Sequence, residues 1–430
     1  MGCGRGNAEA QYRENPDWII LALLNWTNGM GRPHERMSEE LGSGKKLTRK
    51  VRHRYGVSDP QFRREMSAML GPPITSGNRV TALHNGDEIF PAMLEAIRGA
   101  SVSITFETYV YWSGEIGRAF ADVLSERARA GVPVHIILDW AGSAQMDGDV
   151  LTQMEDAGAR VHRYRPLRWY HLSRLSNRTH RKILVVDGRV GFTGGVGIAD
   201  LWKGRAQDSE HWRDIHFRVE GPVVAQFQAA FNDNWIKTTG EVLNDAPFFP
   251  PLEPAGELDA HMFIASPSGG GESMHLMYLM AIAAVAKRID LIAAYFVPDE
   301  LLVDALVAAL LRGVRLRILL PGPHIDSETV KIASRGSWGE LLRHGADIQI
   351  YQPTMLQTKL LVVDADHLVH HPPLHRAGHP PPSRPAASAS PRIPRSRPSP
   401  GRAGPRPVPG LRSRRSRRSP GLRVRSVRSP

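Results

Sequence analysis

The chain has 430 residues, of which 41% are hydrophobic, with a single cysteine and a formal net charge of +12. This length and hydrophobic content suffice for one large or two ordinary folded domains, which excludes a wholly disordered chain. A disulfide-stapled scaffold and a multi-thiolate metal site are also excluded, because Cys3 has no second cysteine to join it.

The positive charge is concentrated at the C-terminal end of the chain. Residues 366–430 contain 15 of the 55 Lys and Arg and one acid, which leaves residues 1–365 with 40 basic and 42 acidic residues and a net charge of −2. An overall basic chain suggests nucleic acid or an anionic membrane as partner. Because the body of this chain is nearly neutral, we do not expect nucleic acid to be the partner.

Residues 1–77 are predicted to form an N-terminal extension. The apolar run Trp18–Trp26 (WIILALLNW) is about half of the roughly 20 residues that a spanning helix needs, so no spanning helix is predicted. Basic residues gather at 45–54. Together these features favour either a segment at the interface of an anionic membrane or a buried segment followed by a solvated basic linker.

Residues 78–249 and 258–365, joined by a connector at 250–257, show the same order of predicted elements. In the first block we expect helices at 88–98, 117–130 and 150–157 and strands at 103–111, 132–140, 159–167 and 183–187. In the second block we expect helices at 274–287, 301–313 and 339–345 and strands at 289–297, 314–322, 346–353 and 360–364.

Several of these helical runs end at glycine and lead into short runs rich in Val, Ile and Leu, which is typical of crossovers onto a mostly parallel, buried sheet. The sequence therefore predicts an α/β fold of two similar lobes, each a mostly parallel or mixed sheet flanked by helices. Periodicity alone leaves open whether the blocks are duplicated halves or separate domains.

The segment THRKILVVD at 179–187 combines charged and apolar residues. Alternate side chains of a strand share a face, so His180 and Lys182 are expected to point the same way. A neutral imidazole can attack phosphorus, and an ammonium stabilises charge on phosphate oxygens. Asp187 follows at a turn, where a carboxylate can accept backbone N–H bonds. The alternative is a buried strand with a satisfied histidine and a lysine that reaches solvent.

A glycine-rich turn comes directly after this motif. In GFTGGVG, the Thr193 hydroxyl and the backbone amides of Gly194 and Gly195 are candidates for phosphate binding. The spacing His-x-Lys-x4-Asp followed by a glycine pair resembles the phospholipase D superfamily. The stretches that begin at Asn85, Ile104, Arg168 and His211 resemble its cardiolipin synthase branch.

This resemblance covers residues 78–364 and implies two phospholipase D-like lobes that share one active site at their junction. It implies that His180 is the nucleophile that forms a phosphohistidine, that Lys182 holds the phosphate, and that Asp214 orients the histidine. It implies no metal and no cofactor. Gly197 departs from the family pattern, because an asparagine is expected there.

The second block departs further from the family. In MLQTKLLVVD, Lys359 and Asp364 repeat the spacing of Lys182 and Asp187, but Gln357 stands at the histidine position. Glutamine can hydrogen-bond to a phosphate but cannot transfer a proton near neutral pH. Loss of a general acid typically costs about 10²–10⁴-fold in rate.

Residues 366–430 use only ten residue types, with 15 Pro, 15 Arg and 10 Ser, and are predicted to be disordered. The second lobe is therefore expected to be incomplete. We expect the tail to be an out-of-frame reading or a truncation, with a basic tail that binds lipid or nucleic acid as the alternative. Its histidines resemble a metal tract only superficially, and no metal site is predicted; they are His367, His370, His371 and His375.

The resemblance implies a phosphatidyltransferase that joins phosphatidylglycerol-class phospholipids, bound peripherally at the cytoplasmic face of the membrane. With Gln357 we expect activity to be absent or severely impaired, unless a homodimer pairs two His180 sites. Two alternatives remain. One is a nuclease or phosphodiesterase of the same superfamily, and the other is a non-catalytic protein that binds lipid phosphate.

Overall fold

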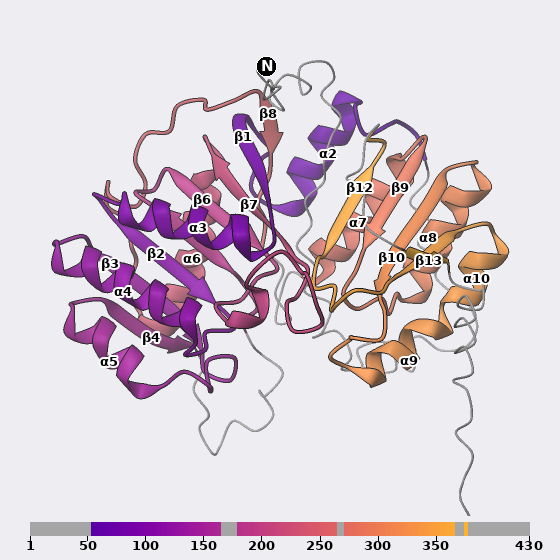
Figure 1. Cartoon of the computed structure of the whole chain (residues 1–430). Helices are drawn as coiled ribbons and strands as arrows, with labels where there is room; N and C mark the ends of the chain where they lie inside the picture. The colour runs from indigo at the N-terminus through magenta and orange to yellow at the C-terminus, as the bar shows by residue number, and fades with distance from the viewer. Residues whose placement is uncertain (1–52, 165–178, 265–270, 366–373, 377–430) are drawn as a thin grey trace, which may run out of the picture. The chain divides into compact units, whose positions relative to one another are not determined.

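The computed structural model describes residues 53–164, 179–264, 271–365 and 374–376, which form two α/β lobes (Figure 1). Within these ranges no helix combines the length and the apolar character that crossing a membrane requires. The apolar run Trp18–Trp26, the basic residues before His53 and nearly all of the Arg/Pro/Ser tail lie outside the described residues.

The first lobe contains an eight-stranded mixed sheet with the strand order β4-β3-β2-β5-β6-β7-β1-β8. The pairs β2·β3 and β3·β4 are parallel, and the remaining pairs are antiparallel. The strands are β1 Thr75–His84, β2 Ile104–Thr108, β3 Val134–Asp139, β4 Arg160–Tyr164, β5 Ile183–Val186, β6 Val190–Gly194, β7 Ile215–Glu220 and β8 Leu258–Ala260.

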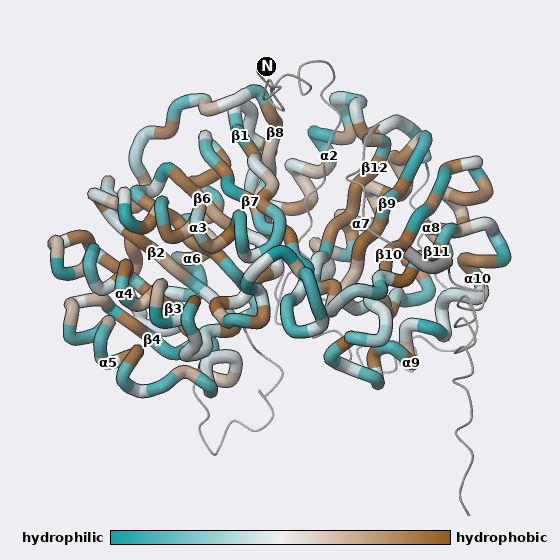
Figure 2. Tube along the Cα trace, in the orientation of Figure 1, coloured by the Kyte–Doolittle hydropathy of each residue, from teal (hydrophilic) through white to brown (hydrophobic). Residues whose placement is uncertain are grey.

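Helices cover both faces of this sheet, and apolar stretches follow the strands (Figure 2). Strands β2, β3 and β5 are buried along their whole length, as expected of strands between two helical layers. One face packs against α3, α4 and α5, and the other packs against α6. These elements are α3 Asn85–Arg98, α4 Glu115–Arg129, α5 Gly148–Asp156, the 3-10 turn η4 Asp200–Trp202 and α6 Val224–Thr239.

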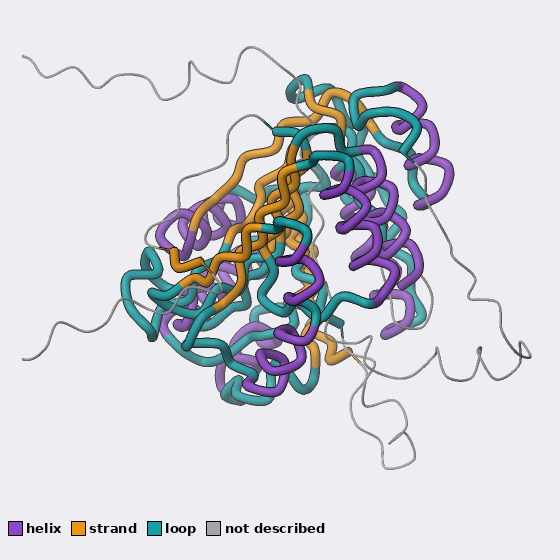
Figure 3. The backbone as a smooth tube through the Cα atoms, turned by 90° about the vertical axis from the view of Figure 1, so that its right-hand side faces the viewer, coloured by secondary structure: helices purple, strands orange, loops and turns teal. Residues whose placement is uncertain are grey.

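The second lobe has a smaller, five-stranded sheet with the order β12-β9-β10-β11-β13. Strands β9, β10 and β11 are parallel, and β12 and β13 pair antiparallel at the two edges. Figure 3 shows the strands and helices in a view turned by 90°, and the apolar residues of α7, α8 and α10 form one core with those of β9, β10 and β11. The elements are α7 Gly271–Ala284, β9 Arg288–Ile292, α8 Glu300–Leu311, β10 Arg315–Pro321, α9 Glu328–Gly336, α10 Trp338–Arg343, β11 Asp347–Tyr351, β12 Leu360–Val363 and β13 Leu374–Arg376.

The predicted fold class of two α/β lobes is confirmed, including the smaller second sheet. Glycines end the predicted crossover helices in the left-handed conformation, which residues with a Cβ rarely adopt. Their φ angles are 86° at Gly131, 97° at Gly158, 91° at Gly313 and 92° at Gly345. Helix α6 and the strands β1, β6, β7 and β8 were not among the elements expected from the sequence, and these strands extend the first sheet beyond β5.

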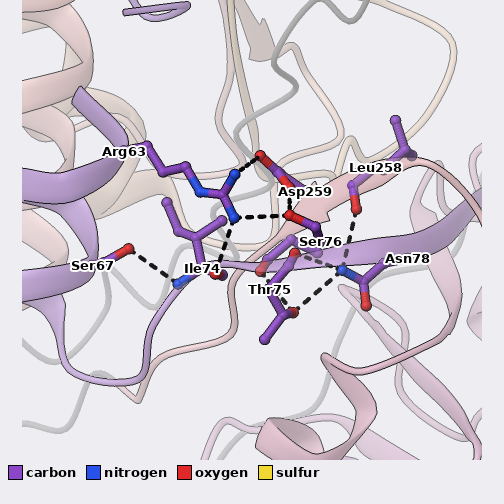
Figure 4. Close-up of polar contacts among 9 residues, drawn as sticks. Arg63, Ser67, Ile74, Thr75, Ser76, Asn78, Leu258 and Asp259 are labelled. Carbon is purple, nitrogen blue, oxygen red and sulfur yellow. Dashed lines mark hydrogen bonds and ion pairs between the residues drawn. The ribbon is translucent and has the colours of Figure 1, made fainter. Parts of the chain in front are cut away.

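Helix α2 spans Pro60–Leu70, and the carboxylate of the preceding Asp59 caps it by accepting from the Gln61 backbone N–H. Its apolar face packs into the core of the second lobe together with α7. Polar contacts also join α2 to the strands β1 and β8 (Figure 4). Arg63 pairs with Asp259 at 2.8 Å and donates to the Ser76 hydroxyl at 2.8 Å. A segment that precedes the first lobe in sequence is thus part of the second lobe's core, and the boundary at residues 77/78 stays a prediction.

Candidate active site

His180 and Lys182 lie in the extended segment that enters β5, which itself begins at Ile183. The His180 ring stacks on the Tyr109 ring with the centroids 4.1 Å apart and an interplanar angle of 17°. The Lys182 Nζ lies 5.5 Å from the centroid of the same ring and donates to the His180 carbonyl at 3.0 Å. Both side chains therefore lie on the side of the segment that faces Tyr109.

The second lobe repeats this arrangement around Gln357. The Lys359 Nζ donates to the Gln357 carbonyl at 3.2 Å and lies 5.8 Å from the centroid of the Tyr295 ring. The Gln357 side chain hydrogen-bonds to the Tyr295 hydroxyl, which donates to the Asp326 carboxylate at 2.6 Å. The Gln357 Oε1 is buried and has no partner among the described residues.

Backbone hydrogen bonds hold the two motif segments together. The Arg213 N–H donates to the Met355 carbonyl, and the Gln357 N–H donates to the Arg213 carbonyl, both at 2.9 Å. The Thr354 hydroxyl adds a bond of 2.9 Å to the His211 carbonyl. Because Arg213 directly precedes Asp214, these bonds bring Asp214 of the first lobe next to the Gln357 motif of the second.

The two lysines and Asp214 form one electrostatic cluster. Burial and the neighbouring Lys359 ammonium lower the pKa of Lys182 to about 7, and burial also lowers the pKa of Lys359. Burial raises the pKa of Asp214 to about 6, although both lysines oppose this change. Two crowded ammonium groups beside one carboxylate form a site that an anion would stabilise.

The Asp214 carboxylate is completely buried. It accepts hydrogen bonds from the Trp202 indole Nε1 at 3.2 Å and from the Ile215 N–H at 2.8 Å. These contacts fix its orientation beside the lysines. Its role in orienting His180 stays a prediction.

Asp187 and Asp364 accept equivalent backbone hydrogen bonds in the two lobes. The Asp187 carboxylate accepts from the backbone N–H groups of residues 101–103 at 2.7–3.1 Å. The Asp364 carboxylate accepts from those of residues 286–288 at 2.7–2.9 Å. Both residues have a positive φ, 53° and 54°. The two carboxylates therefore brace the turns that follow β5 and β12, and a part in the chemistry stays a prediction.

The glycine pair after the first motif is required by close packing. An added Cβ at Gly194 would overlap the His216 ring, and one at Gly195 would overlap the Asp214 carboxylate. At Gly197 an added Cβ would lie 2.6 Å from the Val110 Cβ, so the missing asparagine would not fit here without a shift. Thr193 is buried in β6 beside this pair. Phosphate contacts from Thr193, Gly194 and Gly195 stay predictions.

Sequence reasoning missed a buried polar network behind His180. The Glu107 carboxyl accepts from the Thr179 hydroxyl and, at 2.6 Å, from the Asn234 amide. The Asp139 carboxylate accepts from the Thr179 N–H at 3.0 Å. The signals in the sequence were a lone acid in the predicted strand that contains ITFET at 104–108 and the polar run NDN at 232–234.

His216 is a second histidine near the site that the sequence did not single out. Burial, with a smaller contribution from Lys182, lowers its pKa to about 3. Its ring is therefore neutral near pH 7 and is not a proton donor of suitable strength. Across the described ranges no group of three or more His, Cys, Asp or Glu is arranged to hold a metal ion.

Comparisons with known proteins agree on one family. Residues 93–235 and 278–370 match the sequence model of the family described as cardiolipin synthase, PLD-like domain. A probable cardiolipin synthase of Bacillus subtilis is 33% identical over 294 residues, which cover 68% of this chain and 59% of the relative. Cardiolipin synthase A of Pseudomonas fluorescens is 32% identical over 302 residues, which cover 70% and 62%.

The chain thus spans about three fifths of the length of these relatives. Among solved structures, phosphatidylserine synthase of Haemophilus influenzae aligns with a TM-score of 0.48 and 13% identity, over 71% of this chain and 80% of that one. The family match includes both motif segments and more than half of the chain. The chain belongs to the cardiolipin synthase family with a phospholipase D-like domain.

Proposed function

We propose that this chain is a phosphatidyltransferase whose site holds a phospholipid phosphodiester between Lys182 and Lys359, with His180 as the nucleophile. One observation carries the proposal. Lysines from separate lobes crowd together beside Asp214, and His180 lies next to one of them. A monoanionic phosphodiester would relieve the repulsion between the ammonium groups and would stand within reach of an imidazole nitrogen.

The chemical step follows from these positions. An imidazole nitrogen of His180 attacks phosphorus, the P–N bond forms, and the P–O bond to the leaving alcohol breaks with its electron pair on oxygen. The two lysines stabilise the charge on the non-bridging oxygens. The acceptor alcohol then attacks phosphorus and breaks the P–N bond, which regenerates His180.

Gln357 limits both halves of this cycle. The leaving oxygen needs a proton in the first half, and the acceptor alcohol must lose one in the second. An amide does neither near neutral pH. His216 is neutral, and the Tyr295 pKa is raised by burial and by Asp326. We therefore propose that transfer between ordinary phospholipids is severely impaired in this chain.

The substrate class is proposed from the family. The two curated relatives are named as cardiolipin synthases, and a cardiolipin synthase joins phosphatidyl groups. We propose phosphatidylglycerol as donor and acceptor, and peripheral binding at the cytoplasmic face of an anionic membrane. Pairing of two His180 sites in a homodimer would supply the histidine that the second lobe lacks.

The test uses the full chain with vesicles of labelled phosphatidylglycerol and thin-layer separation of the lipid products. The native chain should give little product, and His180→Ala should remove what remains. Rapid turnover that depends on His180 would contradict the proposed impairment. Hydrolysis of single-stranded DNA at a higher rate than phospholipid turnover would instead favour the nuclease alternative.

Phosphate binding without turnover is a second candidate function, and Gln357 favours it. Its amide can still hydrogen-bond to a phosphate although it cannot transfer a proton. This candidate predicts that phosphatidylglycerol vesicles bind the chain, that Lys182→Ala weakens binding, and that His180→Ala leaves it unchanged. A His180-dependent product of any amount would reject it.

A further inference from the structure

Thr179 and Arg181 flank His180 in the sequence. Their polar groups bond to residues on the side of the segment opposite to the imidazole. The Thr179 hydroxyl donates to the Glu107 carboxyl, and the Thr179 N–H donates to the Asp139 carboxylate at 3.0 Å. The Arg181 guanidinium donates to the Ala230 carbonyl at 2.6 Å and pairs with the Asp233 carboxylate at 2.8 Å. The backbone of His180 is thus held from both neighbouring residues.

Among these residues, Glu107 destabilises the fold the most by being buried. Its side chain is 0% exposed, at the end of the buried strand β2. Burial raises its pKa, so the carboxyl tends towards the neutral form. Its Oε1 accepts from Thr179 and from Asn234 of α6, while its Oε2 has no hydrogen-bond partner among the described residues. A buried carboxyl with an unpaired oxygen destabilises a fold, so its presence calls for a reason other than stability.

We propose that Glu107 and Asn234 are positioning residues for His180. The Glu107 carboxyl and the Asn234 amide, which also donates to the Thr179 hydroxyl at 3.2 Å, form a triangle that fixes the Thr179 side chain. Thr179 in turn fixes the backbone that presents the imidazole and the Lys182 ammonium. This inference rests on the proposed role of His180 as nucleophile.

Fixing the backbone matters because nucleophilic attack depends on short distances. A displacement of about 1 Å at the reacting atom can cost about 10²-fold in rate. The imidazole itself touches Tyr109 on one face. The network fixes the chain behind the ring, which stacking on one face does not do.

The same sheet and helix provide a matched control. Thr105, two residues before Glu107 on β2, donates to the Gln228 side chain of α6 at 3.0 Å. Both residues are buried, and this bond also joins β2 to α6. It lies away from the segment 179–182. Thr105→Val therefore removes a buried bond of the same kind without touching the proposed device.

The first measurement is the burst of p-nitrophenolate from bis(p-nitrophenyl) phosphate. This leaving group needs no proton, so Gln357 does not limit the formation of the phosphohistidine. Glu107→Leu and Asn234→Leu should lower the burst rate at least about tenfold. Glu107→Gln, which keeps an oxygen acceptor, should lower the burst rate by less than about threefold. Thr105→Val should lower it by less than about twofold.

The second measurement is the pKa of the His180 imidazole, followed by NMR in ¹⁵N-histidine-labelled full chain and assigned with His180→Asn. It does not require turnover, so it tests the positioning even if the native chain shows no burst and the proposed function fails. The pKa should move in Glu107→Leu and stay in Thr105→Val. The inference is overturned if Glu107→Leu leaves both measurements unchanged, if Thr105→Val moves them as far, or if Glu107→Gln loses as much as Glu107→Leu.

Discussion

The two lobes have the same lysine and aspartate in their motifs but differ in the residue that the neighbouring strand places opposite the motif strand. Strands β5 and β12 carry the same lysine before them and the same turn-bracing aspartate after them. Glu107 lies opposite Ile183 in the first sheet, and Ile292 lies opposite Leu360 at the equivalent place in the second. The second lobe thus has an apolar residue where the first has a buried acid.

Other residues around the second motif are also apolar or unpaired where those of the first motif are polar and hydrogen-bonded. Behind Gln357 lies an apolar cluster that includes Ile292, Tyr351 and Leu356. The Thr358 hydroxyl, in the place of the anchored Arg181, is buried without a partner among the described residues. The comparison teaches that a motif strand can be maintained without a buried acid packed against it, whereas within the described residues the Glu107–Thr179–Asn234 network lies in the lobe that contains His180.

The largest expected effect comes from making the motifs alike. Gln357→His should raise phosphatidyl transfer by about 10²–10⁴-fold, because it restores a group that gives and takes a proton at this position. Labelled phosphatidylglycerol and product separation measure it. Gln153→His, at a half-buried position of α5 whose side chain bonds to Asp122, should leave the transfer rate unchanged. An unchanged rate in a folded Gln357→His variant would show that the difference between the lobes limits activity at another place.

Removing the turn-bracing aspartate should destabilise both lobes equally. Asp187→Ala and Asp364→Ala should each lower the free energy of unfolding by about 2 kcal/mol, since each removes a charged acceptor of several backbone bonds. The left-handed φ of both positions adds to the cost for alanine. Urea unfolding measures this. Asparagine at either position should recover part of the loss. A cost in one lobe alone would contradict the structural equivalence of the two turns.

The lysine pair predicts a pH dependence of binding. The pKa of Lys182 is about 7 in the free protein, so its ammonium is charged below that pH and neutral above it. Asp214, with a pKa of about 6, becomes negative over the same range and also disfavours an anion. Affinity for soluble dihexanoyl phosphatidylglycerol should therefore fall about tenfold from pH 6 to pH 8, measured by calorimetry.

The control for this dependence is Lys182→Met, which should bind more weakly at pH 6 and show a flatter profile. The Asp214 and Asp139 carboxylates act on the Lys182 pKa in the opposite direction to Lys359 and help to keep Lys182 charged. An affinity that rises with pH would reject the assignment of Lys182 as a phosphate ligand.

The smallest expected effect is a difference in stability between substitutions of Thr358 and Thr179. Thr358→Val should raise the free energy of unfolding by about 1 kcal/mol, because it removes a buried hydroxyl without a partner. Thr179→Val should lower it by about 1 kcal/mol, because it leaves acceptors of the network unpaired. Thermal or urea unfolding of the two variants decides. If both variants changed the free energy of unfolding in the same direction, the polar surroundings of Thr179 and Thr358 would not differ as described.

Much of the fold followed from local patterns. Apolar runs after glycine-ended helices predicted four of the parallel strands, β3, β4, β10 and β11, since these signals lie within about 15 neighbouring residues. The placement of α2 in the second lobe's core did not follow, because an amphipathic helix shows which of its faces is apolar but not which surface will cover it. The strand β8, only three residues long, carried no periodicity to detect.

The sequence by itself determined the two α/β lobes, the repeated Lys and Asp spacing and the substitution of Gln357 for a histidine. Only the tertiary structure decided which residues stand behind each motif. Glu107 and Asn234 meet across 127 residues of sequence, and Arg213 bonds to a segment more than 140 residues away. Their side chains are ordinary members of a strand and a helix by local pattern. Burial alone turns them into a network, because a polar group removed from water must find its partner inside the protein.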